Sequence, residues 1–447
     1  MHQSDPAYRE SLAGGYLLRW GTAADGPGLD ALYGSVFGNE LASGYNHHVV
    51  GYASALLSGR HPLGKPGDVA LVTDAHGTIV AATILMRMAI DYAGKTLHGG
   101  RPEIVATLPE HRNRGFIRKI FGLIHARSAA YGDVFQGITG IPYYYKQFGY
   151  DYALTLGGCR VYPQSAIPQL AADQVEPFRL RKAEIDDIWQ LQMLYERERV
   201  RTHDHLPMLV SSHLDATYWQ WAIGDTGSHE PWVPYMIVDT NGTSVGSLGV
   251  TRVRTNEQLG VYFCNTEPHC RIDEVAGSVL RGVVALAPSV RLWEETVKPF
   301  GAVRAHLGVS HPLYTALRTL PHRVEPPYGW YIRVPAYAAL IAQIAPALEK
   351  RLAQSAYAGY SGTIQVSFYR TGLTLTFARG KLSASDLERP TGEQIAFPPN
   401  VFSQLVFGIH SLEELRATYY DIWAAPEVAT LMDILFPKQA SWVLPLD

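Results

Sequence analysis

The sequence predicts a mixed α/β (α+β) protein that is divided into several domains. The chain has 447 residues, more than the roughly 250 to 300 residues that one hydrophobic core usually serves. Its composition, 47% hydrophobic and 18% charged, provides ample apolar surface for folded domains. Short apolar runs of strand length alternate with stretches in which apolar residues recur every three or four positions, as in amphipathic helices. We therefore expect two or three domains that contain both strands and helices.

The N-terminal part of the chain alternates between predicted strands and a predicted helix. Residues 16–20 form a short apolar run of strand length, and residues 29–37 place their apolar side chains on one helical face. Two further apolar runs, 69–72 and 79–86, flank a polar segment whose Asp and Gly suit a tight reversal. These two runs predict a β-hairpin.

The next predicted strand leads directly into a helix. Residues 104–108 form an apolar run that ends at Pro109, and helical periodicity extends from Phe116 to Ile124. Gly115 stands immediately before this helix. A strand, a short loop that contains arginine and glycine, and a helix are therefore expected in this order.

Two breaks divide the rest of the chain. The polar segment 164–177 is followed by a strand-then-helix pattern over 178–195, which repeats the opening of the chain. Residues 326–329, Pro-Pro-Tyr-Gly, form the second break, and beyond it a helical pattern covers 337–352 and strands alternate between 363 and 377. We expect three domains, with boundaries at 1–163, 178–326 and 330–447.

Composition also argues against several classes of function. A net charge of −3 and a pI near 6.6 give no uniform positive field, so we expect no nucleic-acid partner. The three cysteines, Cys159, Cys264 and Cys270, are odd in number and lack metal-ligand spacing, which fits a reducing compartment and predicts no metal site. The start of the chain lacks a signal-like apolar region, and no stretch approaches the roughly 20 apolar residues of a membrane span. The protein is expected to be cytoplasmic.

The loop before the helix that begins at Phe116 has the features of an anion site. It contains Arg112-Asn113-Arg114-Gly115 and lies where free backbone N–H groups and the helix dipole favour negative charge. Glycine lets the backbone approach a ligand closely. This arrangement suits a pyrophosphate, although Arg-x-x-Gly also occurs as an ordinary helix cap.

The segment from Glu103 to Gly115, followed later by Tyr145-Lys146-Gln147-Phe148-Gly149-Tyr150, resembles the acetyl-CoA signature of the GNAT (N-acetyltransferase) superfamily. Over nearly the whole chain, the sequence resembles the enhanced intracellular survival (Eis) acetyltransferases within that superfamily. This resemblance implies two tandem GNAT-like acetyltransferase domains followed by a sterol-carrier-protein-like α+β domain. The second domain shows no comparable Arg-x-x-Gly turn, so one active site per chain is expected.

The resemblance also implies which residues bind acetyl-CoA. The strand residues would offer backbone hydrogen bonds to the pantetheine, and the loop side chains and helix amides would hold the pyrophosphate. Ordinary strand packing is the alternative for the strand residues, and the superfamily prefers Gly or Ala where this chain has Ile117. The residues carried over are Val105, Ala106, Thr107, Arg112, Asn113, Arg114, Gly115, Phe116 and Ile117.

Tyr145 matches the tyrosine that such enzymes use as general acid. A phenol with a pKa of about 10 stays protonated at neutral pH and can protonate a thiolate whose thiol has a pKa of about 8.5. The alternative is that the aromatic cluster around it only packs the sheet. Glu103 is the candidate base for the acceptor, because it stands two residues before Val105 and should share its strand face. A solvated surface glutamate is the alternative, and His98 and His111 are further candidate bases.

In the Eis group the terminal carboxylate reaches the active site and helps to orient the catalytic tyrosine. The resemblance therefore carries this role to Asp447, although the group ends on an aromatic residue and a frayed terminus is the alternative. Trp219, Trp221 and Trp232 are expected either to wall the acceptor pocket or to form core.

These observations predict an N-acetyltransferase that moves an acetyl group from acetyl-CoA to a primary amine, without a metal. The acceptor would be a small molecule, aminoglycoside- or polyamine-like, or a lysine side chain. A non-catalytic acyl-CoA sensor or a protein that binds an apolar ligand is the alternative. The resemblance also implies a homo-oligomer, either a trimer or a hexamer.

Overall fold

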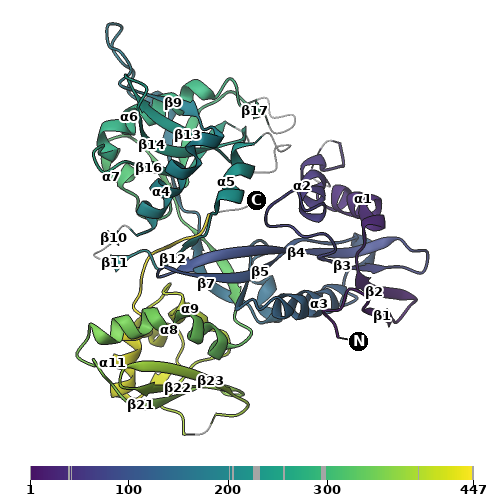
Figure 1. Cartoon of the computed structure of the whole chain (residues 1–447). Helices are drawn as coiled ribbons and strands as arrows, with labels where there is room; N and C mark the ends of the chain where they lie inside the picture. The colour runs from purple at the N-terminus through teal and green to yellow at the C-terminus, as the bar shows by residue number, and fades with distance from the viewer. Residues whose placement is uncertain are drawn as a thin grey trace. The chain divides into compact units, whose positions relative to one another are not determined.

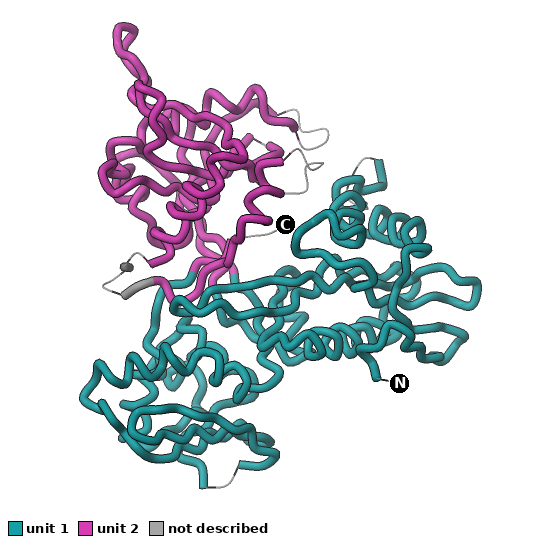
Figure 2. Tube along the Cα trace, in the orientation of Figure 1, with its two compact units in different colours: residues 1–154, 329–441 teal, residues 155–328, 442–447 magenta. Residues whose placement is uncertain are grey.

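The computed structural model (Figure 1) describes residues 2–444 except 39, 40, 42, 201, 204, 205, 225–231, 255, 256, 293–297 and 391. The chain divides into two compact units (Figure 2). Unit 1 consists of residues 1–154 and 329–441, and unit 2 of residues 155–328 and 442–447.

An eight-strand path of mixed direction forms the main sheet of unit 1. The strands from β1 to β5 form antiparallel pairs in sequence, β5 and β6 are parallel, and β6 is antiparallel to β20. In order across the sheet, the strands are β1 (Arg9–Leu12), β2 (Tyr16–Trp20), β3 (Val69–Thr73), β4 (Ile79–Tyr92), β5 (Lys95–Thr107), β6 (Phe135–Ile138), β20 (Tyr328–Arg333) and β7 (Asp151–Leu156).

Three helices cover this sheet. Figure 1 shows α1 (Gly26–Val36) and α2 (His47–Leu57) on one face and α3 (Phe116–Ala130) on the other. The apolar face of α3 packs on buried residues of β2, β3 and β4, as its periodicity predicted. The helix expected at 29–37 is confirmed as α1, whereas α2 was not predicted.

The hairpin predicted from two apolar runs is confirmed, because β3 and β4 pair in antiparallel register. Beyond the predicted end at residue 86, β4 continues and forms a longer hairpin with β5, in which Tyr92 pairs with Lys95. Asp91 is buried near this turn and accepts a hydrogen bond from the Thr96 hydroxyl at 2.7 Å. Such polar positions break the apolar pattern, so the sequence underestimated both strands.

Unit 2 is built on a seven-stranded sheet. In order, the strands are β19 (Arg323–Glu325), β8 (Cys159–Pro163), β18 (Ala302–Ala305), β16 (Gln258–Thr266), β14 (Ser244–Thr251), β13 (Trp232–Asp239) and β9 (Phe178–Lys182). Unit 2 also contains the α-helices α4 (Ile188–Arg199), α5 (Ala216–Ile223), α6 (Ile272–Leu286) and α7 (Pro312–Ala316). Its short strands include β10 (Thr202–His203), β11 (Leu206–Pro207), β12 (Val210–Ser212), β15 (Val253–Arg254) and β17 (Arg291–Leu292).

The two sheets repeat one strand order. In unit 1, β2, β3, β4, β5 and β6 are neighbours in sequence order, and in unit 2 the same holds for β9, β13, β14, β16 and β18. The last pair of each series is parallel, and a 15-residue helix, α3 or α6, connects its two strands. The strand-then-helix repeat that the sequence indicated at 178–195 is confirmed by β9 and α4.

A five-stranded sheet with four helices forms the C-terminal part of unit 1. The strands are, in order, β23 (Lys381–Leu387), β22 (Gly372–Ala378), β21 (Gly362–Ser367), β24 (Ile395–Ala396) and β25 (Trp423–Ala424). The helices are α8 (Tyr337–Ala353), α9 (Phe402–Val406), α10 (Leu412–Thr418) and α11 (Pro426–Leu435), and β26 (Ser441–Trp442) follows them. The helix predicted at 337–352 and the strands predicted between 363 and 377 are confirmed.

The strands next to the expected domain boundaries belong to other sheets than the sequence indicated. Residues 330–333, expected in the third domain, lie in β20 of the first sheet, where Trp330 and Tyr331 are fully buried. Residues 159–163, expected in the first domain, form β8 of unit 2. An apolar run of strand length shows that a strand forms but not which sheet it joins.

Candidate functional site

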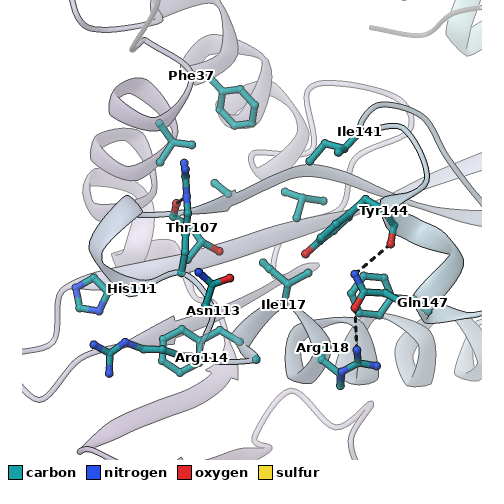
Figure 3. A pocket seen from close by; sticks show the side chains of 17 residues that line it. Phe37, Thr107, His111, Asn113, Arg114, Ile117, Arg118, Ile141, Tyr144 and Gln147 are labelled. Atoms are coloured by element: carbon teal, nitrogen blue, oxygen red, sulfur yellow. Dashed lines mark hydrogen bonds between the residues drawn. The ribbon is translucent and has the colours of Figure 1, made fainter.

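A cavity of about 660 Å3 opens on unit 1 beside the loop that contains Gly115 (Figure 3). Its lining comes from the end of α1, the end of β5, the loop after β5, the start of α3 and the 3-10 helix η3 (Tyr144–Phe148). The nine residues that the sequence analysis assigned to acetyl-CoA all line it: Val105, Ala106, Thr107, Arg112, Asn113, Arg114, Gly115, Phe116 and Ile117.

A bulge in β5 shapes one wall of the cavity. Ala106 pairs with Ala82, but Glu103 pairs with Ile84, so β5 has one more residue than β4 in this interval. Ile104, within the bulge, has a φ of 52°, which is uncommon for a β-branched residue. The bulge therefore interrupts the alternation of faces along β5.

The end of β5 extends past its parallel neighbour. The register between β5 and β6 covers Gly99 with Phe135 and Gly100 with Gln136. Further along β5, Val105, Ala106 and Thr107 line the cavity. The Thr107 carbonyl accepts a hydrogen bond from Arg112 Nε at 3.4 Å. The side-chain Oγ1 of Thr107 is buried and has no hydrogen-bond partner among the described residues. Main-chain and side-chain polar groups of β5 thus reach the cavity wall.

Two left-handed residues turn the chain from β5 into α3. Asn113 has a φ of 62° and Gly115 a φ of 77°, and Gly115 is the N-cap of α3. No side chain caps this helix, so its first backbone N–H groups remain available to an anion. A Cβ built on Gly115 would meet nothing within 4 Å, which shows that the backbone here borders open space.

Three guanidinium groups make the cavity cationic. Arg112 and Arg114 are exposed and have no carboxylate partner among the described residues. Arg118 donates a hydrogen bond to Gln147 Oε1 at 2.8 Å (Figure 3). In the part of the chain that the structure describes, no Asp or Glu lines this cavity. A positive N-terminal helix end together with unpaired arginines favours a polyanionic group such as a diphosphate.

The two neighbouring tyrosines of η3 have different environments. Tyr144 is half-buried and points into the cavity (Figure 3), and burial raises the pKa of its phenol while Arg118 opposes that shift. Tyr145 is only 4% exposed and packs with Phe121, Tyr150 and Tyr331 in an aromatic cluster that Val105 also contacts. The structure thus places the predicted general acid next to the β5 wall and its neighbour on the cavity surface.

Glu103 lies on a different sheet face from the one that the sequence predicted. The register places Ala106 and Glu103 opposite Ala82 and Ile84, which share one face because they are two residues apart on β4. The assumption that Glu103 shares the face of Val105 is therefore wrong, and the bulge is the reason.

On this face, Glu103 is held by a buried cation. Arg101 is fully buried, and its Nε lies 2.5 Å from Glu103 Oε2. The guanidinium also lies over the Trp330 ring at 4.8 Å. Burial, and after it the Glu103 carboxylate, raises the pKa of Tyr33 on α1. Glu103 therefore lies on the α1 side of the sheet and does not line the cavity.

The other sequence candidates are spread over the molecule. Asp447 lies outside the described residues. His98 is exposed, whereas His111 lines the cavity and its Nδ1 lies 3.0 Å from the Tyr16 hydroxyl. The tryptophans Trp219, Trp221 and Trp232 are at most 8% exposed in unit 2, which favours the core interpretation.

Sequence reasoning missed several residues of the cavity. Phe37, Arg118, Ile141 and Gln147 line it in addition to Tyr144. Arg118 lies three residues after Gly115, in the first turn of α3. Its place near the cavity could therefore have been inferred. Phe37 belongs to the end of α1 and reaches the cavity only through tertiary packing, which no local pattern indicates.

In the described part of the chain, no group of three or more His, Cys, Asp or Glu side chains could hold a metal ion. None of the described helices is long and apolar enough to cross a bilayer. The three cysteines are buried free thiols.

A known family matches the part of the chain that forms this cavity. Residues 31–153 match the family model of the acetyltransferase (GNAT) domain, which spans the cavity walls from α1 to β7. No curated protein matches the sequence.

Solved structures resemble the chain over almost its full length. A GCN5-related N-acetyltransferase from Kribbella flavida has 17% identity and a TM-score of 0.64, and the match covers 97% of this chain and 98% of that one. One from Anabaena variabilis has 13% identity and a TM-score of 0.65, with 96% and 99% covered. Eis1 from Mycobacterium abscessus has 13% identity and a TM-score of 0.57, with 95% and 98% covered. At such identities the likeness establishes a shared fold.

Proposed function

We propose that this chain, whose residues 31–153 form a GNAT acetyltransferase domain, transfers an acetyl group from acetyl-CoA to a primary amine. The observation that carries the proposal is the cavity at the glycine turn. An uncapped helix N-terminus, two unpaired arginines and the exposed end of a strand meet there. The diphosphate of an acyl-CoA fits the helix N-terminus and the arginines. Its pantetheine arm carries amides that can bond to the exposed end of the strand.

The donor would be held by two kinds of contact. The amides of Gly115, Phe116 and Ile117, with Arg112, Asn113 and Arg114, would bind the diphosphate. The backbone of Val105, Ala106 and Thr107 would pair with the amides of the pantetheine, as a further strand pairs with a sheet edge. This leads the thioester toward the aromatic cluster around Tyr145.

The transfer itself needs one nucleophile and one proton donor. The acceptor nitrogen attacks the thioester carbonyl carbon, a C–N bond forms, and the C–S bond breaks with its electron pair passing to sulfur. The Tyr145 phenol would then give its proton to the departing thiolate. Before the attack, Glu103, held by Arg101 on the α1 side of the sheet, would accept one proton from the acceptor ammonium. The second proton, which the nitrogen loses as the amide forms, would return to the Tyr145 phenolate. The products are then the amide, the free CoA thiol and a protonated Glu103, which releases its proton to water.

The acceptor is proposed to be an amine of a small molecule, aminoglycoside- or polyamine-like, or a lysine side chain. A terminal carboxylate at Asp447 that orients the catalytic tyrosine is part of the same proposal.

Unit 2 is proposed to be a second GNAT-like domain that lacks a phosphate turn. Its strand order supports this proposal. Between β16 and α6, where unit 1 has its arginine and glycine turn, unit 2 has Glu267, which pairs with Arg197 at 2.7 Å. A carboxylate at that place opposes an anion, so one donor site per chain is expected.

The remaining assignments complete the proposed organisation. The domains would span 1–163, 178–326 and 330–447, with β8 and β20 exchanged as described above. The C-terminal sheet with its helices would be a sterol-carrier-protein-like domain. The protein would work in the cytoplasm as a homo-oligomer, a trimer or a hexamer.

A non-catalytic acyl-CoA sensor is the second candidate. The burial of Tyr145 favours it, because a phenol that is 4% exposed reaches a ligand less readily than one on the cavity surface.

The test is release of free CoA thiol from acetyl-CoA with a broad panel of amines. The transferase predicts thiol release that depends on an amine and falls about 100-fold in Tyr145→Phe. The matched control is Tyr144→Phe, which removes the neighbouring hydroxyl and should retain most of the rate. Acetyl-CoA binding by calorimetry without turnover would favour the sensor, and no binding would contradict both functions.

A further inference from the structure

We infer that Tyr152 and Tyr331 are positioning residues whose hydroxyl groups together hold the segment that carries Tyr144 and Tyr145 beside the cavity. This inference rests on the proposed function, since it concerns the geometry of the same site.

The segment before η3 contains a residue in an unfavourable backbone conformation. Tyr143 has a φ of 65°, in the left-handed region that few residues other than glycine adopt. Its side chain is 74% exposed, so packing of this side chain does not enforce the conformation. Within the turn, the Tyr144 N–H donates to the Ile141 carbonyl at 3.3 Å, and contacts from outside the turn add to this single bond.

Two tyrosine hydroxyl groups supply such contacts. The Tyr152 hydroxyl accepts a hydrogen bond from the Tyr143 backbone N–H at 3.4 Å and donates one to the Tyr331 hydroxyl at 2.5 Å. The Tyr331 hydroxyl donates to the Ile141 carbonyl at 3.3 Å. These three hydrogen bonds thus form one chain, which connects the Tyr143 N–H through both hydroxyls to the Ile141 carbonyl.

Tyr152 and Tyr331 both belong to strands of the first sheet and not to the turn. Tyr331 is fully buried in β20, which pairs with β6, and Tyr152 belongs to β7 on the other side of β20. Their rings stack with centroids 4.0 Å apart at 28°. The Tyr331 ring also meets the Tyr145 ring edge to face, with centroids 5.5 Å apart. A rigid support therefore contacts both the turn and the proposed general acid.

The turn matters because its own residues and the residue directly after it form part of the site. Ile141 and Tyr144 line the cavity, and Tyr145 lies in the cluster at its wall. The phosphate turn around Gly115 belongs to a different segment. Releasing residues 141–145 should therefore disturb the acyl end of the site more than the grip on the diphosphate.

The experiment compares Tyr331→Phe, Tyr152→Phe and the double variant. Each variant keeps both aromatic rings and loses only hydroxyl groups. The control is Tyr92→Phe, because Tyr92 is equally buried in unit 1 and its hydroxyl donates to the Val406 carbonyl at 2.7 Å.

We expect kcat to fall about tenfold in each single variant, while KM for acetyl-CoA changes less than about threefold. The double variant should resemble the single ones, because both hydroxyls belong to one chain of bonds. The control should keep the parental kcat.

Hydrogen exchange of residues 141–148 gives a second readout that does not depend on turnover. The backbone amides of this segment should exchange at least about tenfold faster in Tyr331→Phe and Tyr152→Phe than in the parent or in Tyr92→Phe. Unchanged exchange, or a kcat that matches that of the control, would overturn the inference. A parent protein that transfers no acetyl group, but whose segment is released in these variants, would contradict the proposed function and leave the positioning role supported.

Discussion

Glu103 and Ala106 face the same side of the first sheet, although an odd number of positions separates them on β5. The bulge at Ile104 produces this relationship and places Glu103 next to the buried guanidinium of Arg101, on the face away from Val105. The proposed acceptor base therefore lies on the face of β5 opposite to Val105 and outside the lining of the donor cavity.

Replacing Glu103 by Gln should lower stability as well as activity. The variant removes the carboxylate from a fully buried arginine, and we expect the free energy of unfolding to fall by about 2 kcal/mol. Urea denaturation measures this loss. The control is Glu110→Gln, at a glutamate whose side chain is 65% exposed. Equal stability of the two variants would contradict a structural role of the Arg101–Glu103 pair.

Gly115 offers a matched pair of substitutions at the phosphate turn. Its φ of 77° strains any other residue, but an added Cβ meets no atom within 4 Å. Gly115→Ala should therefore cost about 1 kcal/mol of stability and weaken acetyl-CoA binding only a few fold. Gly115→Asp carries similar strain but adds a negative charge. The Kd of this variant for acetyl-CoA should rise by more than about 30-fold. Calorimetric titration measures both constants, and similar values would show that no anion binds at this turn.

Ile117 narrows the cavity at the first turn of α3. It is half-buried, lines the cavity and packs on the cluster around Phe121. Alanine would widen the site and favours a helix more than isoleucine does. We expect Ile117→Ala to lower the Kd for acetyl-CoA about threefold, measured by the same titration. Weaker binding would mean that the isoleucine side chain contacts the donor favourably.

His125 should make unit 1 less stable in acid. Burial, and after it the nearby Arg333, lowers the pKa of His125 to about 3. In the unfolded chain the imidazole binds a proton below a pH of about 6.5, whereas in the folded protein it stays neutral until far lower pH. The free energy of unfolding should therefore fall as the pH decreases from about 6.5 toward 3, by about 1 to 2 kcal/mol at pH 5.

The His125→Gln variant isolates this contribution. Glutamine does not titrate, but it can still form a hydrogen bond with the Tyr150 hydroxyl, which lies 2.8 Å from His125 Nε2. Denaturant unfolding between pH 7.5 and 5 should show a smaller loss of stability in this variant than in the parent. His98→Gln, at an exposed histidine, should leave the parental slope unchanged. An identical slope in all three proteins would contradict the buried, neutral state of His125.

Local patterns predicted the helix α3, the hairpin of β3 and β4, and the turn at Gly115, because each is encoded within a few consecutive residues. The nine proposed donor-binding residues are consecutive or nearly so, and all of them line one cavity. The face of Glu103 was predicted wrongly because a bulge residue with positive φ carries no distinctive sequence signal when it is isoleucine.

Other features depend on tertiary packing. The sequence could not indicate that β20 inserts between β6 and β7, because any apolar strand can join either sheet. For the same reason it could not indicate that Tyr331 contacts Tyr145, although the two are far apart in the chain.

A crystal structure with coenzyme A bound tests the central claim most directly. The account predicts the diphosphate about 3 Å from the amides of residues 115–117 and in contact with Arg112 or Arg114. The pantetheine should run beside Val105 and Thr107 and point its sulfur toward Tyr145. Coenzyme A bound elsewhere on the chain, with the turn around Gly115 free of phosphate, would contradict it.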